Sequence, residues 1–223
     1  MIKMISSIKD CPLVIDLHYF ASINYYRALI EYDILKFEQY EHYQKGSCRN
    51  RCYIAGPDGL ILLSVPLARG KNQRIILKDV RIANEGKWQA IHWKTLTSAY
   101  RRSPWFEYHE EDLQQLYERR YTFLLDWNLD LFELVRHWLG LSWQVELTGE
   151  YQQTYDPESC ADLRNIFLPA IREPTIPPYT QVFGDRTGFL PGLSILDLIF
   201  CEGRSAAERL RGPAELPKKI QQP

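Results

Sequence analysis

Short apolar runs alternate with one amphipathic segment at the start of the chain. Residues 12–17 read PLVIDL, an apolar run that ends in an acid and predicts a buried first strand. The next segment, HYFASINYYRALIEY over 18–32, predicts a helix with its N-cap at Ser22 or Asn24. Residues 33–38 alternate between apolar and polar and predict a second strand. This order is typical of a βαβ unit, in which ligands bind where the strands end.

The pattern then changes to that of a hairpin. Residues 49–67 contain two apolar runs separated by the sequence PDG at 57–59. The proline presets one dihedral angle, the aspartate bonds its own backbone and the glycine accepts a positive φ, so a tight turn is predicted. Residues 69–74 (RGKNQR) predict a basic loop, either solvated or able to bind a phosphate or carboxylate. The alternating run IILKDVRIA at 75–83 predicts another strand.

From residue 87 onward the apolar period becomes helical. Residues 87–103 predict a helix that Pro104 ends, and two further helices are predicted over 107–121 and 124–141, with Gly140 as the C-cap of the last. The apolar face of the first of these helices is predicted to contain Trp88, Ile91, Leu96 and Tyr100. Three consecutive helices after a strand-rich half indicate a helical layer packed on a sheet.

The last third of the chain is less regular. Residues 143–151 return to strand alternation, whereas the proline-rich segment 156–193 predicts an ordered loop with little regular structure. Ser194 is then a candidate N-cap for the apolar helix 195–203, and a short helix is predicted over 205–212.

These elements predict an α/β protein. We expect a mixed sheet with an N-terminal βαβ-like unit and a β-hairpin, followed by a helical section and a C-terminal helix. The expected organisation is a single domain over 1–212, strand-rich over 12–84, helical over 86–140, and ending in a proline-rich loop and apolar helix over 156–212. A polar tail follows at 213–223.

Charge and cysteine content exclude some classes of function. The chain has 27 Lys plus Arg and 28 Asp plus Glu, and this balance gives no support to nucleic-acid binding. Five scattered cysteines, of which only Cys48 and Cys52 are close, lack the spacing of a zinc site and are typical of reduced thiols. The first residues lack the apolar run of a signal peptide, and no segment has the uninterrupted length of a membrane span. We therefore expect a cytoplasmic protein with no metal site.

The first candidates for chemistry lie just after the second predicted strand. No phosphate-loop, dinucleotide-binding, nucleophile-elbow or HExxH motif occurs, so no cofactor can be named. Glu38 and His42 are four residues apart and would share one face of a helix or strand. A carboxylate beside an imidazole orients the ring and raises its basicity, which a general base needs. The alternative is a surface pair on a loop.

A second set of candidates could bind an anionic or hydroxylated ligand. Arg49 and Arg51 flank Asn50 before the hairpin, so two guanidinium groups could hold a phosphate while the amide reads a hydroxyl. Lys45 could neutralise developing charge, and Tyr43 could contact the ligand. Alternatively, one of the arginines pairs with Glu38 or Glu41, or the whole polar stretch braces the hairpin.

Two further residue types allow weaker hypotheses. His18 follows the first predicted strand, where a βαβ unit exposes its ligand-binding edge, so it is a candidate binding residue. A nucleophilic Cys48 or Cys52 with His42 as its base is conceivable, but a small buried thiol is the simpler interpretation.

Five ordered blocks, spanning about residues 13–210, carry a resemblance to a known family. They read YFASINYYRAL, FEQYEHYQKGSCRNRCYIAGPDGLILLSVPL, KDVRIANEGKWQAIHWKTLTSAYRRSPWFEYHEEDL, YTFLLDWNLDLFELVRHWLG and YTQVFGDRTGFLPGLSILDLIFCEG. The chain resembles the WbqC-like proteins of bacteria. Many members have a proline-bearing turn after the first aromatic pair, where this chain has Phe20-Ala21-Ser22.

The resemblance implies a biosynthetic pathway but no particular reaction. The family is named after a gene found among surface-polysaccharide (O-antigen) biosynthesis genes, which implies a role in making or decorating sugar chains. The leading hypothesis is a transferase that acts on an activated or amino sugar, with a small-molecule or carrier-linked sugar as its ligand. The alternative is a non-catalytic adaptor that binds a sugar or a partner in the same pathway.

Overall fold

The computed structural model describes residues 11–68, 74–169 and 176–211 of the 223-residue chain. Most of the predicted basic loop at 69–74 and the whole predicted tail at 213–223 lie outside the described residues. The prediction of a single domain over 1–212 stays a prediction.

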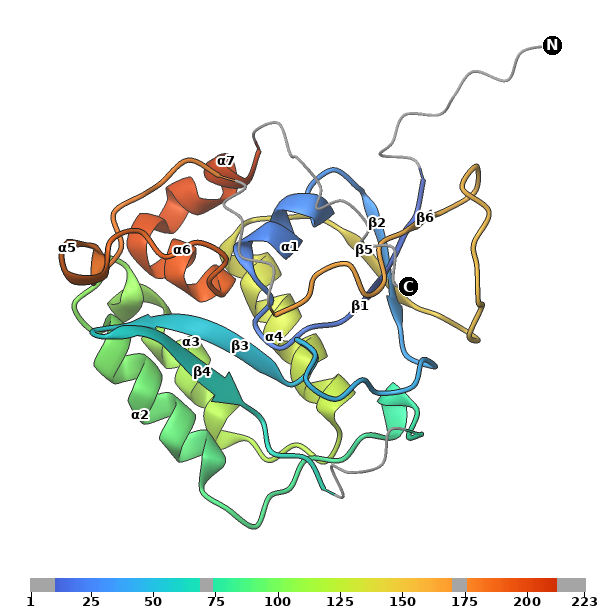
Figure 1. The fold of residues 1–223 in the computed structure, drawn as a ribbon, viewed down its shortest axis with the longest axis horizontal. Helices are drawn as coiled ribbons and strands as arrows, with labels where there is room; N and C mark the ends of the chain where they lie inside the picture. The colour runs from blue at the N-terminus through green and yellow to red at the C-terminus, as the bar shows by residue number, and fades with distance from the viewer. Residues whose placement is uncertain (1–10, 69–73, 170–175, 212–223) are drawn as a thin grey trace.

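A parallel four-stranded sheet forms the centre of the molecule, in the order β5-β2-β1-β6 (Figure 1). Its strands are β1 (Leu13–Asp16), β2 (Ile34–Glu38), β5 (Gln144–Leu147) and β6 (Ala161–Asp162). Strand β1 is buried throughout, in agreement with its three successive apolar residues, and it ends at the buried Asp16. Helix α1 (Ile23–Leu29) connects β1 to β2, and Ser22 caps it by accepting a hydrogen bond from the Tyr25 backbone N–H. The predicted βαβ unit is therefore confirmed.

The predicted hairpin is also present. Strands β3 (Arg51–Gly56) and β4 (Gly59–Ser64) pair antiparallel, and Gly59 has a φ of +118° at the turn. The two strands form a sheet of their own, so the central sheet is parallel rather than mixed. The α/β class with a βαβ unit, a hairpin, a helical section and a C-terminal helix is confirmed.

Most of the remaining elements are helices. The helical section consists of α2 (Trp88–Tyr100), α3 (Phe106–Glu118) and α4 (Leu124–Trp138), and the C-terminal part adds α5 (Gly184–Thr187), α6 (Ile195–Glu202) and α7 (Ala206–Leu210). Figure 1 shows α2 and α3 behind the hairpin and α6 beside α1. Helix α6 ends at Gly203, where φ is +54° and a Cβ atom would lie 2.2 Å from the Trp105 ring.

Two local predictions were wrong. Residues 75–83 form no strand but a 3₁₀ turn at Leu77–Asp79, because the N–H groups of Leu77 and Lys78 bond to the carbonyls of Glu41 and Gln39 rather than to a continuous neighbouring strand. Ile91 is 62% exposed instead of lying on the buried face of α2, where His92 takes its place. Among its described residues, the proline-rich segment has little regular structure, as predicted: it contains only β6 and α5, of two and four residues, which are too short to leave a periodic signal.

Candidate functional site

The candidate site lies at the carboxyl ends of the four parallel strands. Asp16 ends β1 and Glu38 ends β2. Tyr151 follows β5, and Asn165 follows β6 by a few residues. In an open parallel sheet this edge is where ligands bind, because the strand-to-helix loops gather there.

A polar group, the Arg49 cluster (Asp16, His18, Glu41, Arg49 and Asn165), lies at this edge. All its members except the exposed Asn165 are buried. The Arg49 guanidinium donates to both Glu41 carboxylate oxygens, each at 2.6 Å, and lies 3.3 Å from Asp16 Oδ2. It also donates to Asn165 Oδ1 at 2.8 Å. Asp16 accepts hydrogen bonds from the His18 ring and, at 2.7 Å, from the Asn165 backbone N–H. Arg49 and Asp16 are each only 1% exposed, so these bonds form away from bulk solvent, where they are strong.

The two carboxyl groups of the Arg49 cluster have shifted pKa values in opposite directions. Burial alone would raise the pKa of Asp16, but Arg49 and His18 outweigh it and hold this pKa well below its usual range. Burial raises the pKa of Glu41 to about 7 although Arg49 opposes the rise, and the neighbouring Asp16 and Glu38 carboxylates add to it. Two carboxylates share one guanidinium, so the first ionises easily and the second does not.

A second group, the Arg164 cluster (Glu38, Asp162 and Arg164), lies beside the first. Glu38 is fully buried and accepts hydrogen bonds from the Tyr40 backbone N–H at 2.8 Å, Thr148 Oγ1 at 2.9 Å and Arg164 Nη1 at 3.2 Å. Asp162 binds the same guanidinium through both of its oxygens, at 2.9 and 2.8 Å. These bonds tie the segments that follow β2, β5 and β6 to one another.

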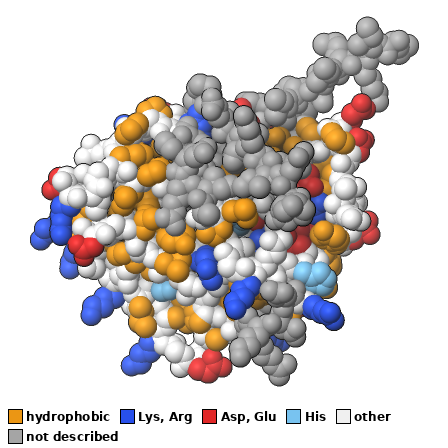
Figure 2. Space-filling view, in the orientation of Figure 1, with side chains coloured by type: hydrophobic (Ala, Val, Ile, Leu, Met, Phe, Trp, Pro, Cys, Tyr) orange, Lys and Arg blue, Asp and Glu red, His pale blue; other side chains and the backbone are white. Residues whose placement is uncertain are grey.

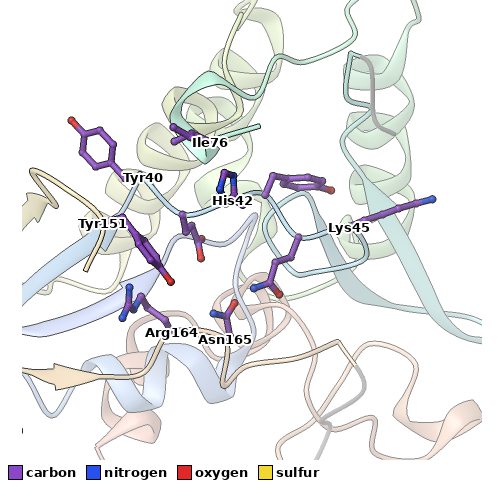
Figure 3. Close-up of a pocket in the computed structure, with 10 residues that line it drawn as sticks. Tyr40, His42, Lys45, Ile76, Tyr151, Arg164 and Asn165 are labelled. Carbon is purple, nitrogen blue, oxygen red and sulfur yellow. The ribbon is translucent and has the colours of Figure 1, made fainter. Parts of the chain in front are cut away.

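Both groups border a cleft of about 590 Å³ (Figure 3). Residues 40–45 supply one part of its lining, and Ile76, Tyr151, Arg164 and Asn165 supply the rest. The lining thus combines tyrosine rings, an imidazole, a carboxylate, amides and cations. Such a surface suits a ligand that has both apolar faces and many hydrogen-bonding groups.

Comparison with known proteins places the chain in a family. Residues 17–167 match the model of the WbqC-like protein family. The chain belongs to this family. The uncharacterized protein Rv1507c of Mycobacterium tuberculosis (strain ATCC 25618 / H37Rv) is 26% identical to it over 222 residues, covering 86% of this chain and 91% of that protein. No solved structure matches the chain.

Three of the predicted site residues of this WbqC-like protein lie on the cleft. His42, Tyr43 and Lys45 all line it, and the His42 and Lys45 side chains are exposed. The Tyr43 hydroxyl donates to Asn50 Oδ1 at 2.9 Å, and the Asn50 amide donates to the Val65 carbonyl at 2.8 Å. Asn50 is therefore buried behind the cleft wall.

The other predicted residues are located elsewhere. Glu38 makes its hydrogen bonds with Tyr40, Thr148 and Arg164, and none of the bonds formed among the described residues joins it to His42. His18 is buried against Asp16, and Arg49 pairs with Glu41, which was the structural alternative considered for this arginine. Arg51 lines a different cavity, together with Cys48 and Cys52. That these residues contact a ligand stays a prediction.

The cleft also contains residues that the sequence pattern did not single out. Tyr151, Arg164 and Asn165 come from segments after the helical section, a hundred or more residues from the predicted site residues at 38–51. Asp16 was visible only as the acid that ends an apolar run.

Residues 11–68, 74–169 and 176–211 contain no group of three His, Cys, Asp or Glu side chains placed to hold a metal ion. Over those residues, no helix combines the length and the apolar character needed to cross a bilayer.

Proposed function

We propose that this WbqC-like protein is a group-transfer enzyme of cell-surface polysaccharide (O-antigen) biosynthesis that acts on an activated or amino sugar. The observation that carries the proposal is the cleft at the carboxyl edge of the sheet. Its lining includes His42, Lys45 and three tyrosines, on a scaffold fixed by two buried ion-paired groups. The family and its association with surface-polysaccharide genes support the substrate class.

In the proposed reaction, His42 is the general base. A hydroxyl or amino group of the acceptor attacks the transferable group of an activated donor, and its proton passes to a ring nitrogen of His42. The bond between the donor and its leaving group breaks, and the leaving group keeps the electron pair. Lys45 stabilises the negative charge that develops there. Glu38 contributes indirectly, because it holds Arg164 and Tyr40 at the cleft wall.

The proposal is tested by replacing the base. We expect His42→Ala to lower turnover by about a hundredfold or more, the usual contribution of a general base. The unfolding midpoint should stay unchanged, because the His42 side chain is exposed. The matched control is His137→Ala, which removes another exposed histidine, on α4 and outside the cleft. Full activity in His42→Ala would remove His42 from the mechanism.

The donor is found by measuring thermal unfolding with candidate ligands. Nucleotide-sugars, nucleotides, acyl donors and inorganic phosphate are each added to the purified protein. A ligand present at a hundred times its dissociation constant stabilises the native state by roughly 2.7 kcal/mol, which raises the midpoint measurably. The donor class that gives a shift is then used in the turnover assay.

One observation favours a second function, a non-catalytic adaptor that binds a sugar or a partner of the same pathway. None of the side-chain hydrogen bonds formed among the described residues involves the His42 ring, so no carboxylate of these residues orients it. Ligand binding without any conversion of donor and acceptor, in the wild-type protein, would favour the adaptor.

A further inference from the structure

Tyr151 is an exposed aromatic side chain on the wall of the cleft. It is 53% exposed and follows β5, at the carboxyl edge of the sheet. Single exposed aromatic residues are common on protein surfaces and need no function. Tyr108, which is 74% exposed on α3 and lies outside the cleft, is such a case. Tyr151 differs from Tyr108 because an ion-paired arginine holds the segment that carries it.

Arg164 holds the segment that carries Tyr151. Its guanidinium donates to the Gln152 carbonyl at 2.9 Å and to the Gln153 carbonyl at 3.4 Å, immediately after Tyr151. Its remaining bonds anchor it to the Glu38 and Asp162 carboxylates. All five N–H donors of the arginine are thereby used within the protein. Arg164 is therefore not free to bind an anionic ligand with these donors.

The same guanidinium also packs on the aromatic rings of this segment. Its central carbon lies 5.4 Å from the centre of the Tyr151 ring and 4.9 Å from that of Tyr155. Figure 3 shows the Tyr151 and Arg164 side chains next to each other at the cleft. An exposed ring that is fixed in this way loses little conformational entropy when a ligand packs on it, and preorganisation of this kind increases affinity.

The surroundings of the ring indicate the shape and polarity of its ligand. Glu41, Gln44 and Asn165 line the same cleft, and so does Tyr40, whose ring carries the Lys78 ammonium group at 4.4 Å. A pyranose ring has a flat face of C–H groups and a rim of hydroxyl groups, so it can pack on an aromatic ring while polar side chains bond its rim.

We propose that Tyr151 is the platform on which the sugar ring of the ligand packs, and that Arg164 is the residue that positions it. This inference rests on the proposed function for its choice of a sugar as ligand. It adds a specificity-determining residue that does not take part in the chemical step.

The test measures binding of methyl glycosides, UDP-glucose and UDP by calorimetry. We expect Tyr151→Ala to weaken the binding of the methyl glycosides and UDP-glucose by about tenfold, as when an aromatic stacking contact is lost, and to leave UDP unaffected. Tyr151→Trp should preserve binding, and the fluorescence of the introduced indole should change when a glycoside is added. Tyr108→Ala is the matched control and should bind as the wild type does.

The positioning role of Arg164 has its own readout. Arg164→Lys keeps the charge but loses the planar set of donors, so it should weaken the binding of glycosides and not of UDP. If Arg164 acts only by positioning Tyr151, both substitutions remove the same contact. The double variant Arg164→Lys/Tyr151→Ala should then bind glycosides no more weakly than Tyr151→Ala alone. Additive losses would show that Arg164 acts elsewhere.

The outcomes separate this inference from the proposed function. If Tyr151→Ala weakens the binding of UDP and UDP-glucose equally, the nucleotide base packs on Tyr151 instead of the sugar. If the binding of all ligands is unchanged, no ligand packs on Tyr151. Either result overturns the inference but does not contradict the proposed transferase function. Methyl glycosides that bind through Tyr151 in a protein that converts no donor would support the inference and contradict the transferase. If none of the three probes binds to the wild-type protein, the proposal that Tyr151 is a platform for a sugar ring is overturned.

Discussion

Two buried carboxylates, Asp16 and Asp197, are treated differently by the fold. Asp16 ends a strand beside the cleft and faces a guanidinium and an imidazole. Asp197, in the first turn of α6, is fully buried, and every hydrogen bond that its carboxylate accepts from a described residue comes from a neutral donor. Asp197 and these donors form the Asp197 cluster. These donors are the Tyr100 hydroxyl at 2.8 Å, the Tyr179 hydroxyl at 2.5 Å and Gln181 Nε2 at 3.1 Å. The two carboxylates are almost equally buried, but the partners of Asp16 include a cation whereas those of Asp197 are neutral.

The pKa values respond to that difference. Burial raises the pKa of Asp197, and its three donors only partly oppose the rise. At Asp16 the cationic partners reverse the effect of burial and lower the pKa. The Asp197 cluster joins α2, α6 and the segment 176–193 through neutral hydrogen-bond donors, whereas in the Arg49 cluster a guanidinium favours the ionised form of Asp16 beside an open cleft. We infer that the first is a structural brace and the second a support for the site.

The largest expected effect comes from removing the shared cation. Arg49→Met should lower the free energy of unfolding by about 3–5 kcal/mol at pH 7, because it leaves Asp16 and Glu41 buried without their counter-ion. Denaturant titration measures the loss. Arg186→Met is the matched control: Arg186 pairs with Asp58 at the surface, at 3.4 Å, and an exposed pair of this kind contributes about 1 kcal/mol or less. Equal losses in the two variants would show that the Arg49 cluster contributes no more to stability than an exposed ion pair does.

Most of the helices and strands could be predicted from the sequence, because the patterns that indicate them involve residues close together in the chain. The apolar run of β1, the Ser22 cap, the turn before Gly59 and the periods of α2 to α4 each depend on neighbouring residues. The strand predicted at 75–83 failed because its backbone groups bond to the segment around Glu41, which is not visible in a pattern of side chains.

The candidate site could be predicted only in part. The carboxyl-edge rule pointed to His18 and to the stretch that contains His42 and Lys45, and the latter two do line the cleft. Arg164 and Asn165 could not be found, because they reach the site only when β6 pairs beside β1, and the Asn165–Asp16 bond joins residues 149 positions apart. Nor can a sequence show whether Arg49 faces a ligand or a buried carboxylate.

A smaller effect is expected in the pH dependence of stability, where the contributions of Asp16 and Asp197 to the free energy of unfolding should change in opposite directions as the pH rises. Asp16 has a lowered pKa, so its stabilising contribution is present above its ordinary value of 3.8 and is lost as the pH falls. Asp197 has a raised pKa, so its contribution is present below 3.8 and is lost as the pH rises through the native value. Each Asp→Asn change is expected to alter the free energy of unfolding by about 1–3 kcal/mol.

The cost of Asp16→Asn should therefore shrink between pH 7 and pH 3, and the cost of Asp197→Asn should shrink between pH 4 and pH 8. Denaturant titration of both variants and the wild type at each pH measures these differences. Curves that move in the same direction would show that burial, and not the charge of the partners, decides how the two sites behave.

The smallest expected effect tests whether the Asp197 cluster is only a brace. Tyr179→Phe removes the hydroxyl that donates to Asp197 but keeps the ring, so the free energy of unfolding should fall by about 1 kcal/mol. Tyr108→Phe, which changes an exposed hydroxyl, should have no measurable effect. Ligand affinity and turnover should be the same in Tyr179→Phe as in the wild type, because neither Tyr179 nor Asp197 lines the cleft. A loss of affinity without a loss of stability would mean that the Asp197 cluster is coupled to the site, and the separation of the two carboxylates into brace and support would then have to be abandoned.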